Sequence, residues 1–197
     1  MIATGPKDLV KPPKVRGWTF DELADEVPES NQPMELWDGE LIMPPAPSFS
    51  HQKTSDHFHD LLKAWVRKHH LGDTVVSPID MVLTKHRTTQ PDVVFISKER
   101  LGIIKKQIIG PADLIAEIIS PESRKRDRID KRDLYEQHGI KEYWIVDPEA
   151  ETVEVLYLES GQYKLIGRWN PGQRARSRLL KGFKVSVSAV LESPSWC

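Results

Sequence analysis

Short apolar runs separated by turn residues predict a chain in which strands and helices alternate. The segments 34–37 and 40–43 flank Asp38-Gly39, a pair that suits a two-residue turn, so a β-hairpin is expected there. β-branched and aromatic residues predict four further strands, at 74–83, 91–97, 113–120 and 141–147. Alternating apolar and polar positions predict an antiparallel β extension after residue 150, at 151–158, 162–169 and 184–191.

Helical periodicity and capping residues predict two helices in the first half of the chain. Thr19, with Glu22 three residues later, forms a capping box ahead of a short helix at 20–27. A long helix is expected from about Ser50 to the residues before Gly72. Its apolar stripe consists of Phe58, Leu61, Leu62, Trp65 and Val66.

The second half of the chain adds a loop and a third helix. The basic, glycine-punctuated stretch 98–112 is expected to be a loop with a short helical turn. The residues 124–138 predict a helix that Gly139 ends. Together the elements predict an α/β fold, a mixed β-sheet core flanked by helices, with an N-terminal hairpin and a C-terminal antiparallel β extension.

Composition narrows the class of protein without naming a function. The 197 residues, 39% of them hydrophobic, are enough for one domain, expected at 17–197 behind a loosely ordered arm at 1–16. The net charge of −1 gives no global basic field, and a lone cysteine, Cys197, excludes a disulfide framework and a cysteine zinc site. No apolar stretch approaches the roughly 20 residues of a membrane span, and the first residues lack the apolar core of a signal peptide. A cytoplasmic protein is therefore expected.

Two carboxylates stand in segments that are otherwise typical of buried strands. Asp92 opens the apolar run 93–96, and Glu117 lies in the middle of 114–119. A buried carboxylate is costly unless it is paired, hydrogen-bonded or bound to a cation. If the two strands are neighbours, both acids can converge on one hard cation such as Mg²⁺ or Mn²⁺, which prefers oxygen ligands. A structural origin is an equal alternative for Asp92 alone, because Pro-Asp pairs often begin strands.

The third helix carries side chains that can reach the same place. Asp127, Lys131 and Tyr135 are spaced i, i+4, i+8 and share one face, and the short connection before the helix lays Lys131 beside Glu117. A lysine there can position water or stabilise phosphate charge. Upstream, Glu35 in the hairpin and His51 at the start of the long helix can face the same cleft, with His51, Asp127 and Tyr135 as surrounding residues rather than ligands.

Basic residues on that helix offer a local surface for nucleic acid on a chain that is otherwise near neutral. Arg124, Lys125 and Arg128 are the candidates for phosphate contacts. The alternative is an ordinary solvated face, which accounts for most charge runs.

These residues, in this order, resemble a known family. The stretch ELWDGELI, a histidine at the head of a helix, PDVVFIS, and LIAEIISPESRKRDRIDKRDLYEQHGIKEYWIVDP resemble the Uma two family of the restriction-endonuclease-like, PD-(D/E)XK nuclease superfamily. The resemblance runs from about Met34 to Leu191 and is densest at 114–148. It implies a restriction-endonuclease-like fold and hydrolysis of phosphodiester bonds that depends on a divalent metal.

The resemblance also assigns roles residue by residue. Asp92 and Glu117 match the acidic metal ligands of the family, and Glu35 matches its early glutamate. The lysine that the superfamily places two residues after the glutamate is Ile119 here, and Lys131 on the following helix is its natural replacement.

The resulting hypothesis is a metal-dependent endonuclease that uses Mg²⁺ or Mn²⁺, acts on DNA and forms a homodimer. Asp92, Glu117, Glu35 and Lys131 are its expected catalytic residues. Two alternatives stay open. One is a nuclease-fold protein that has lost catalysis and binds nucleic acid or a protein partner. The other is a structural module in which Glu117 and Lys131 form a buried ion pair, and that reading predicts no metal affinity.

Overall fold

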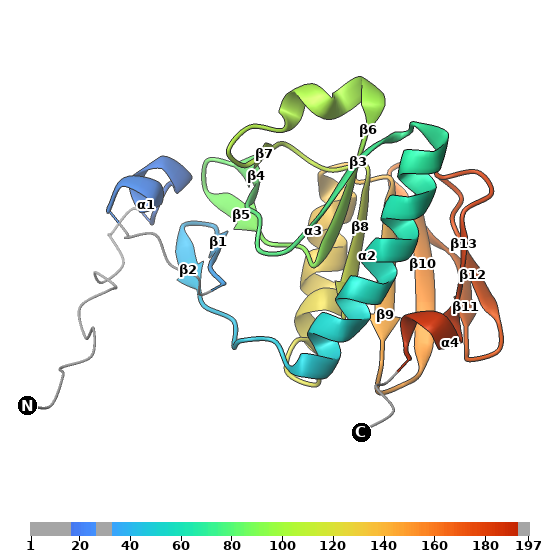
Figure 1. The fold of residues 1–197 in the computed structure, drawn as a ribbon. Coiled ribbons are helices and arrows are strands. Elements are labelled where there is room, and N and C mark those ends of the chain that lie inside the picture. Colours follow the sequence, from blue (N-terminus) through green and yellow to red (C-terminus); the bar gives the residue numbers. More distant parts are fainter. Residues whose placement is uncertain (1–16, 27–32, 193–197) are drawn as a thin grey trace, which may run out of the picture.

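A computed structural model describes residues 17–26 and 33–192, so the predicted arm at 1–16 lies outside the described residues. Two mixed β-sheets and one two-stranded sheet form the scaffold, with helices packed on them (Figure 1). The predicted class, an α/β fold with mixed sheets flanked by helices, is confirmed. No helix in the described ranges is long and apolar enough to cross a membrane.

A six-stranded sheet is the centre of the fold. Its strands, in spatial order, are β11 (Gln162–Trp169), β10 (Thr152–Glu159), β9 (Glu142–Asp147), β8 (Leu114–Ile118), β6 (Val93–Ser97) and β3 (Gly72–Val76). β8 and β9 run parallel, and the other neighbours are antiparallel. The sequences of β6 and β8 are almost entirely apolar because helices and the second sheet cover both faces of this sheet. Every residue of β8 is buried.

Two hydrophobic clusters cover the faces of this sheet. One contains Leu114, Ala116 and Ile118 of β8 and packs against α2 (Phe49–His69). The other contains Ile115 and Ile119 and packs against α3 (Arg132–Gln137) and the second sheet. Figure 1 shows the sheet between α2 and α3. Since side chains alternate along a strand, Glu117 belongs to the α3 side.

The second sheet contains the predicted hairpin. Its strands, in spatial order, are β2 (Glu40–Ile42), β1 (Glu35–Trp37), β5 (Arg87–Thr89), β4 (Met81–Thr84) and β7 (Ile108–Ile109). Asp38 and Gly39 both have positive φ, 51° and 84°, as a two-residue hairpin turn requires, so the hairpin is confirmed. The sequence pattern missed β5 and β7, which are only two or three residues long.

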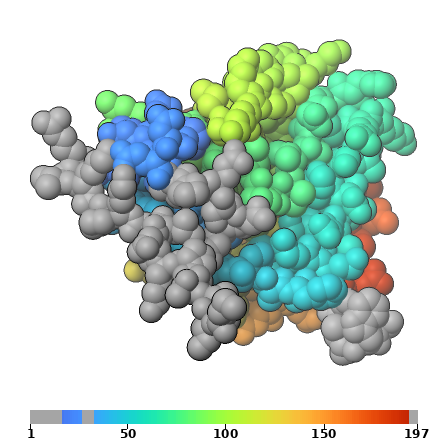
Figure 2. All heavy atoms as spheres, turned by 60° about the vertical axis from the view of Figure 1, so that its left-hand side comes forward, coloured from blue at the N-terminus to red at the C-terminus, as the bar shows by residue number. Residues whose placement is uncertain are grey.

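The first two helices begin close to the positions that the sequence predicts. In α1 (Phe20–Glu26), the Thr19 hydroxyl accepts from the Glu22 amide at 3.2 Å and Glu22 accepts from the Thr19 amide at 3.1 Å, which completes the capping box. α2 begins after Ser48, whose hydroxyl accepts from the His51 amide at 3.2 Å. In the view that brings this side forward, α1 and the first turns of α2 lie on one face (Figure 2).

Two details of the long helix were predicted wrongly. Leu61 is 38% exposed and does not belong to the buried stripe. The helix ends at His69, and His70 in the left-handed conformation is its cap, so Gly72 is not the stop. Gly72 instead begins β3, where a Cβ would lie 2.0 Å from the backbone oxygen of Ile96. The glycine is required by a close approach of two backbones.

The segment 74–83 is not one strand, contrary to the prediction. β3 ends at Val76 and joins the six-stranded sheet, whereas β4 begins at Met81 and joins the other sheet. Pro78 lies between them, and a proline cannot donate a hydrogen bond to a β-ladder. The turn at 77–80 therefore connects the two sheets and forms part of the cavity wall described below.

The remaining elements differ from the prediction in detail. The loop 98–112 contains the expected helical turn, η1 (Lys98–Ile103). The third helix is a π-helix, η2 (Arg126–Lys131), followed by α3, and Gly139 follows its end in the left-handed conformation as expected. The predicted strand 184–191 is β13 (Lys184–Ser186), which pairs with β12 (Arg174–Arg176), followed by α4 (Val187–Val190). Val187 and Val190 are both buried, and their spacing of three is helical rather than alternating.

Candidate active site

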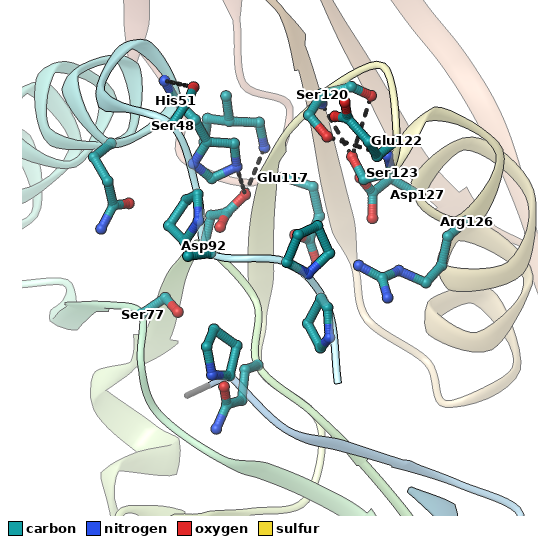
Figure 3. A pocket seen from close by; sticks show the side chains of 18 of the residues that line it. Ser48, His51, Ser77, Asp92, Glu117, Ser120, Glu122, Ser123, Arg126 and Asp127 are labelled. Carbon is teal, nitrogen blue, oxygen red and sulfur yellow. Dashed lines mark hydrogen bonds and ion pairs between the residues drawn. The ribbon is translucent and has the colours of Figure 1, made fainter. Parts of the chain in front are cut away.

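A cavity of about 670 Å³ opens where β6 begins and β8 ends in the six-stranded sheet, between the hairpin, the start of α2 and η2. Its floor includes Glu35, Asp92, Glu117, Asp127 and Lys131, and Figure 3 shows several of these side chains around it. Prolines supply much of the wall: Pro33, Pro44, Pro45, Pro47, Pro78 and Pro121. Because the proline ring fixes φ, this wall is stiff.

The register of two antiparallel strands brings the two predicted metal ligands together. β6 pairs with β8 so that Val93 is opposite Ala116, which places Asp92 and Glu117 at the next position of the ladder. The Ile118 amide donates to Asp92 Oδ2 at 2.8 Å, and His51 Nε2 lies 3.3 Å from the same oxygen. Burial lowers the pKa of His51, but the hydrogen bond and the charge of Asp92 outweigh burial, so the pKa of the imidazole is raised.

Glu117 is held from the helix side by two donors. Lys131 Nζ lies 2.9 Å and the Tyr135 hydroxyl 2.6 Å from Glu117 Oε1. Glu117 is 2% exposed and Lys131 is 4% exposed, so solvent screens this contact little. Burial raises the pKa of Glu117 well above its usual range; Lys131 opposes this shift, while Asp92 and Asp127 reinforce it.

Lys131 is shared among several acids rather than paired with one. Its Nζ also lies 3.3 Å from Glu35 Oε1 and 3.6 Å from Asp127 Oδ1. Burial alone would lower the pKa of Lys131, but the surrounding carboxylates raise it well above its ordinary value. The amine is therefore an ammonium at neutral pH and cannot act as a base.

Glu35 reaches this lysine from the hairpin. Its Oε1 accepts from the Gln90 amide at 3.2 Å, and its Oε2 accepts from Trp37 Nε1 at 3.1 Å. Arg126 NH1 lies 4.0 Å from Oε2. The second sheet thus contributes one acid to a site that the six-stranded sheet otherwise builds.

Asp127 differs from the other acids in its bonding. It is 2% exposed and lines the cavity, and its Oδ1 has no hydrogen-bond partner. Burial raises the pKa of Asp127, although Lys131 and a hydrogen bond from Ser123 partly oppose the shift. The Tyr143 hydroxyl donates to the Asp127 carbonyl at 2.9 Å and anchors this turn of η2.

The donor set fits a divalent cation. Five carboxylates line the cavity, those of Glu35, Asp92, Glu117, Glu122 and Asp127, against two cationic side chains, Arg126 and Lys131. Burial raises the pKa of Glu117 and of Asp127, and the neighbouring carboxylates raise both further; a hard cation would offset this repulsion. In the part of the chain that the structure describes, no group of three or more histidine, cysteine, aspartate or glutamate side chains is placed to hold a metal ion directly. Mg²⁺ and Mn²⁺ suit such a site, since they often take one or two carboxylates and complete the shell with water and phosphate.

The predicted phosphate contacts lie away from the cavity lining. Arg124 NH1 and Arg128 NH2 lie 2.7 and 3.1 Å from Asp147 Oδ2. Arg128 also contacts Glu154 at 2.7 Å, and Arg124 contacts Glu149 at 2.7 Å; Lys125 is exposed. The basic residue of this segment that does line the cavity is Arg126, which sequence analysis missed. A π-helix has more residues per turn than an α-helix, so α-helical spacing could not identify it.

Comparisons with known proteins decide the family. The family model described as "Uma2: Putative restriction endonuclease" matches residues 19–188. The chain belongs to the Uma2 family. A comparison with curated proteins found no match for this Uma2 chain.

A solved structure supports the fold of this Uma2 protein. It is described as a "putative nuclease belonging to DUF820 from Anabaena variabilis ATCC 29413", and it has 18% sequence identity and a TM-score of 0.73. The similarity covers 88% of this chain and 97% of that chain. The restriction-endonuclease-like fold of the Uma2 chain is confirmed, and the family description indicates a nuclease-like role.

Proposed function

We propose that this member of the Uma2 family is an endonuclease that hydrolyses phosphodiester bonds in DNA with the help of Mg²⁺ or Mn²⁺. The observation that carries the proposal is the position of Lys131. Its Nζ lies 2.9 Å from Glu117 and 3.3 Å from Glu35, beside a cavity that Asp92 also lines. Acids at the ends of two strands and one ammonium therefore surround a single place where a phosphate can enter.

Asp92 and Glu117 are the residues that we assign to the cation. When bound, the cation supplies Lewis acidity toward the phosphate and activates water at neutral pH. Lys131 and Tyr135 both contact Glu117 Oε1, so Oε2 is the oxygen that we assign to the ion. The Ile118 amide and His51 fix the orientation of Asp92, which means that His51 positions a ligand rather than replacing one.

Lys131 acts as a fixed positive charge in this proposal. Since its pKa is raised, it donates hydrogen bonds and stabilises the negative charge that builds on the phosphate in the transition state. Glu35 holds the ammonium toward the cavity, and Trp37 and Gln90 hold Glu35.

Arg126, with Lys125 outside the cavity, is placed to meet the phosphate backbone of a nucleic acid. The phosphate roles predicted for Arg124 and Arg128 require these residues to act while bound to Asp147. A homodimer stays a prediction, which light scattering on a size-exclusion column would test by giving twice the chain mass of 22.6 kDa.

A structural module is the second candidate, and one observation favours it. Lys131 already forms a buried ion pair with Glu117, as the structural alternative requires. The excess of acids around that pair argues for a cation site, because an ion pair alone does not need five carboxylates. Metal binding without cleavage would identify a lapsed nuclease, and the absence of metal binding would favour the structural role.

The test is cleavage of covalently closed circular DNA, duplex and single-stranded, by the purified full chain in Mg²⁺ and in Mn²⁺. Asp92→Asn and Lys131→Met serve as variants, and Lys125→Met serves as a control outside the cavity. We expect cutting that requires a divalent metal, persists in the control and is lost in both site variants. Cutting that persists in Asp92→Asn would refute the assignment of this site.

A further inference from the structure

A buried carboxylate oxygen without a hydrogen bond is costly, and Asp127 has one inside the cavity. The side chain is 2% exposed, and Oδ1 accepts no hydrogen bond. Figure 3 shows Asp127 on η2, across the cavity from Asp92 and close to Arg126. No hydrogen-bond donor among the described residues reaches this buried oxygen.

Lys131 does not account for the position of Asp127. The distance of 3.6 Å from Nζ to Oδ1 is longer than its distances to Glu117 and Glu35, 2.9 and 3.3 Å. The backbone sets the position instead, because the Asp127 amide donates to the Ser123 carbonyl at 2.9 Å and the Tyr143 hydroxyl donates to the Asp127 carbonyl. Short π-helical segments such as η2 are frequent at functional sites.

The charges around Asp127 indicate what its oxygen binds. The carboxylates of Asp92 and Glu117 repel that of Asp127, and Lys131 is already closer to two other acids. A neutral donor would leave this repulsion in place, whereas a divalent cation would offset it. No group of three or more such side chains in the described ranges is placed to hold a metal ion directly, so Asp127 would act on the ion through a water molecule.

We propose that Asp127 is a third acidic residue of the cation site and that its free Oδ1 helps to hold the hydrated divalent ion bound by Asp92 and Glu117. The inference rests on the proposed function. It assigns to Asp127 a part in metal affinity, rather than the role of a surrounding residue that only supports Lys131.

The experiment is calorimetric titration of Mn²⁺ into the full chain, without DNA. The variant is Asp127→Asn, which keeps the shape of the side chain, and Asp127→Ser is a second variant in case the first does not fold. Asp130→Asn is the matched control, since Asp130 is an exposed acid on the same turn of η2 and its loss changes the net charge equally. Thermal unfolding in EDTA reports whether each variant folds.

We expect Asp127→Asn to weaken Mn²⁺ binding about 10–100-fold, the range for residues that support metal ligands. Asp130→Asn should stay within about twofold of the wild type, since an exposed charge is screened. In EDTA, Asp127→Asn should unfold no more easily than the wild type. Equal Mn²⁺ affinity in a folded Asp127 variant, or an equal loss in Asp130→Asn, would overturn the inference. If the wild type binds no Mn²⁺, the proposed function itself fails.

Discussion

Removing the charge of Lys131 should destabilise the protein strongly, because it leaves acids buried without a cation. Lys131→Met keeps the length of the side chain and loses an ammonium that lies 2.9, 3.3 and 3.6 Å from Glu117, Glu35 and Asp127. At an effective dielectric constant of about 20, each contact amounts to roughly 5 kcal/mol before desolvation. Burying methionine does not carry the desolvation cost of burying lysine, and the acids can take up protons. The free energy of unfolding is therefore expected to fall by about 3–5 kcal/mol.

Urea unfolding in EDTA, followed at pH 8 and at pH 5.5, measures this loss. The loss should be largest at pH 8, where the stranded carboxylates must be ionised, and smaller at pH 5.5, because the raised pKa of Glu117 lets it take up a proton. Lys125→Met, at an exposed position, should stay within about 0.5 kcal/mol of the wild type. If Lys131→Met lowers the free energy of unfolding by less than about 1 kcal/mol, or by an amount independent of pH, then Lys131 does not offset the charge of these acids.

Three further substitutions test other contacts, each by denaturant unfolding in EDTA. Asp92 raises the pKa of His51, so their contact stabilises the fold fully below about pH 6.5 and stops doing so as the pH rises through the pKa of His51 in the folded protein. His51→Gln should therefore lower the free energy of unfolding more at pH 5.5 than at pH 8.5. Equal decreases at the two pH values would contradict this prediction. Tyr135→Phe removes the donor 2.6 Å from Glu117 and should cost about 1.5–3 kcal/mol, whereas an unchanged stability would show that the bond contributes nothing. Gly72→Ala should lower the free energy of unfolding by about 1–3 kcal/mol or more, because the added Cβ would clash with a backbone oxygen. Gly102→Ala is its control: the added Cβ meets no atom within 4 Å, so stability should be unchanged or higher.

The convergence of the acids could be predicted because it depends on burial and on strand order. Asp92 and Glu117 are polar exceptions in apolar runs, and antiparallel neighbours place the start of β6 beside the end of β8. Lys131 and Tyr135 followed from helical spacing, which survives the π-helical segment because α3 continues from it. A polar residue within an apolar run and the spacing of residues on one helix are both visible in a short stretch of sequence.

The rest of the site depends on contacts between distant segments. Nothing in the hairpin sequence indicates that Glu35 accepts from Trp37 and from the Gln90 amide while it holds Lys131. The role of Arg126 depends on the wider turn of η2, which α-helical periodicity does not describe. The wall at 77–80 exists because the chain changes sheets at Pro78, a choice made by packing between two sheets.

Anomalous diffraction from a crystal of the full chain soaked in Mn²⁺ would show whether Asp92 and Glu117 hold a divalent cation. We expect an anomalous peak in the cavity, at bonding distance from an oxygen of each carboxylate, with Lys131 still contacting Glu117 Oε1. The same soak of Asp92→Asn should lack the peak. A wild-type crystal with Mn²⁺ ordered elsewhere and none between these two side chains would show that Asp92 and Glu117 do not form a cation site.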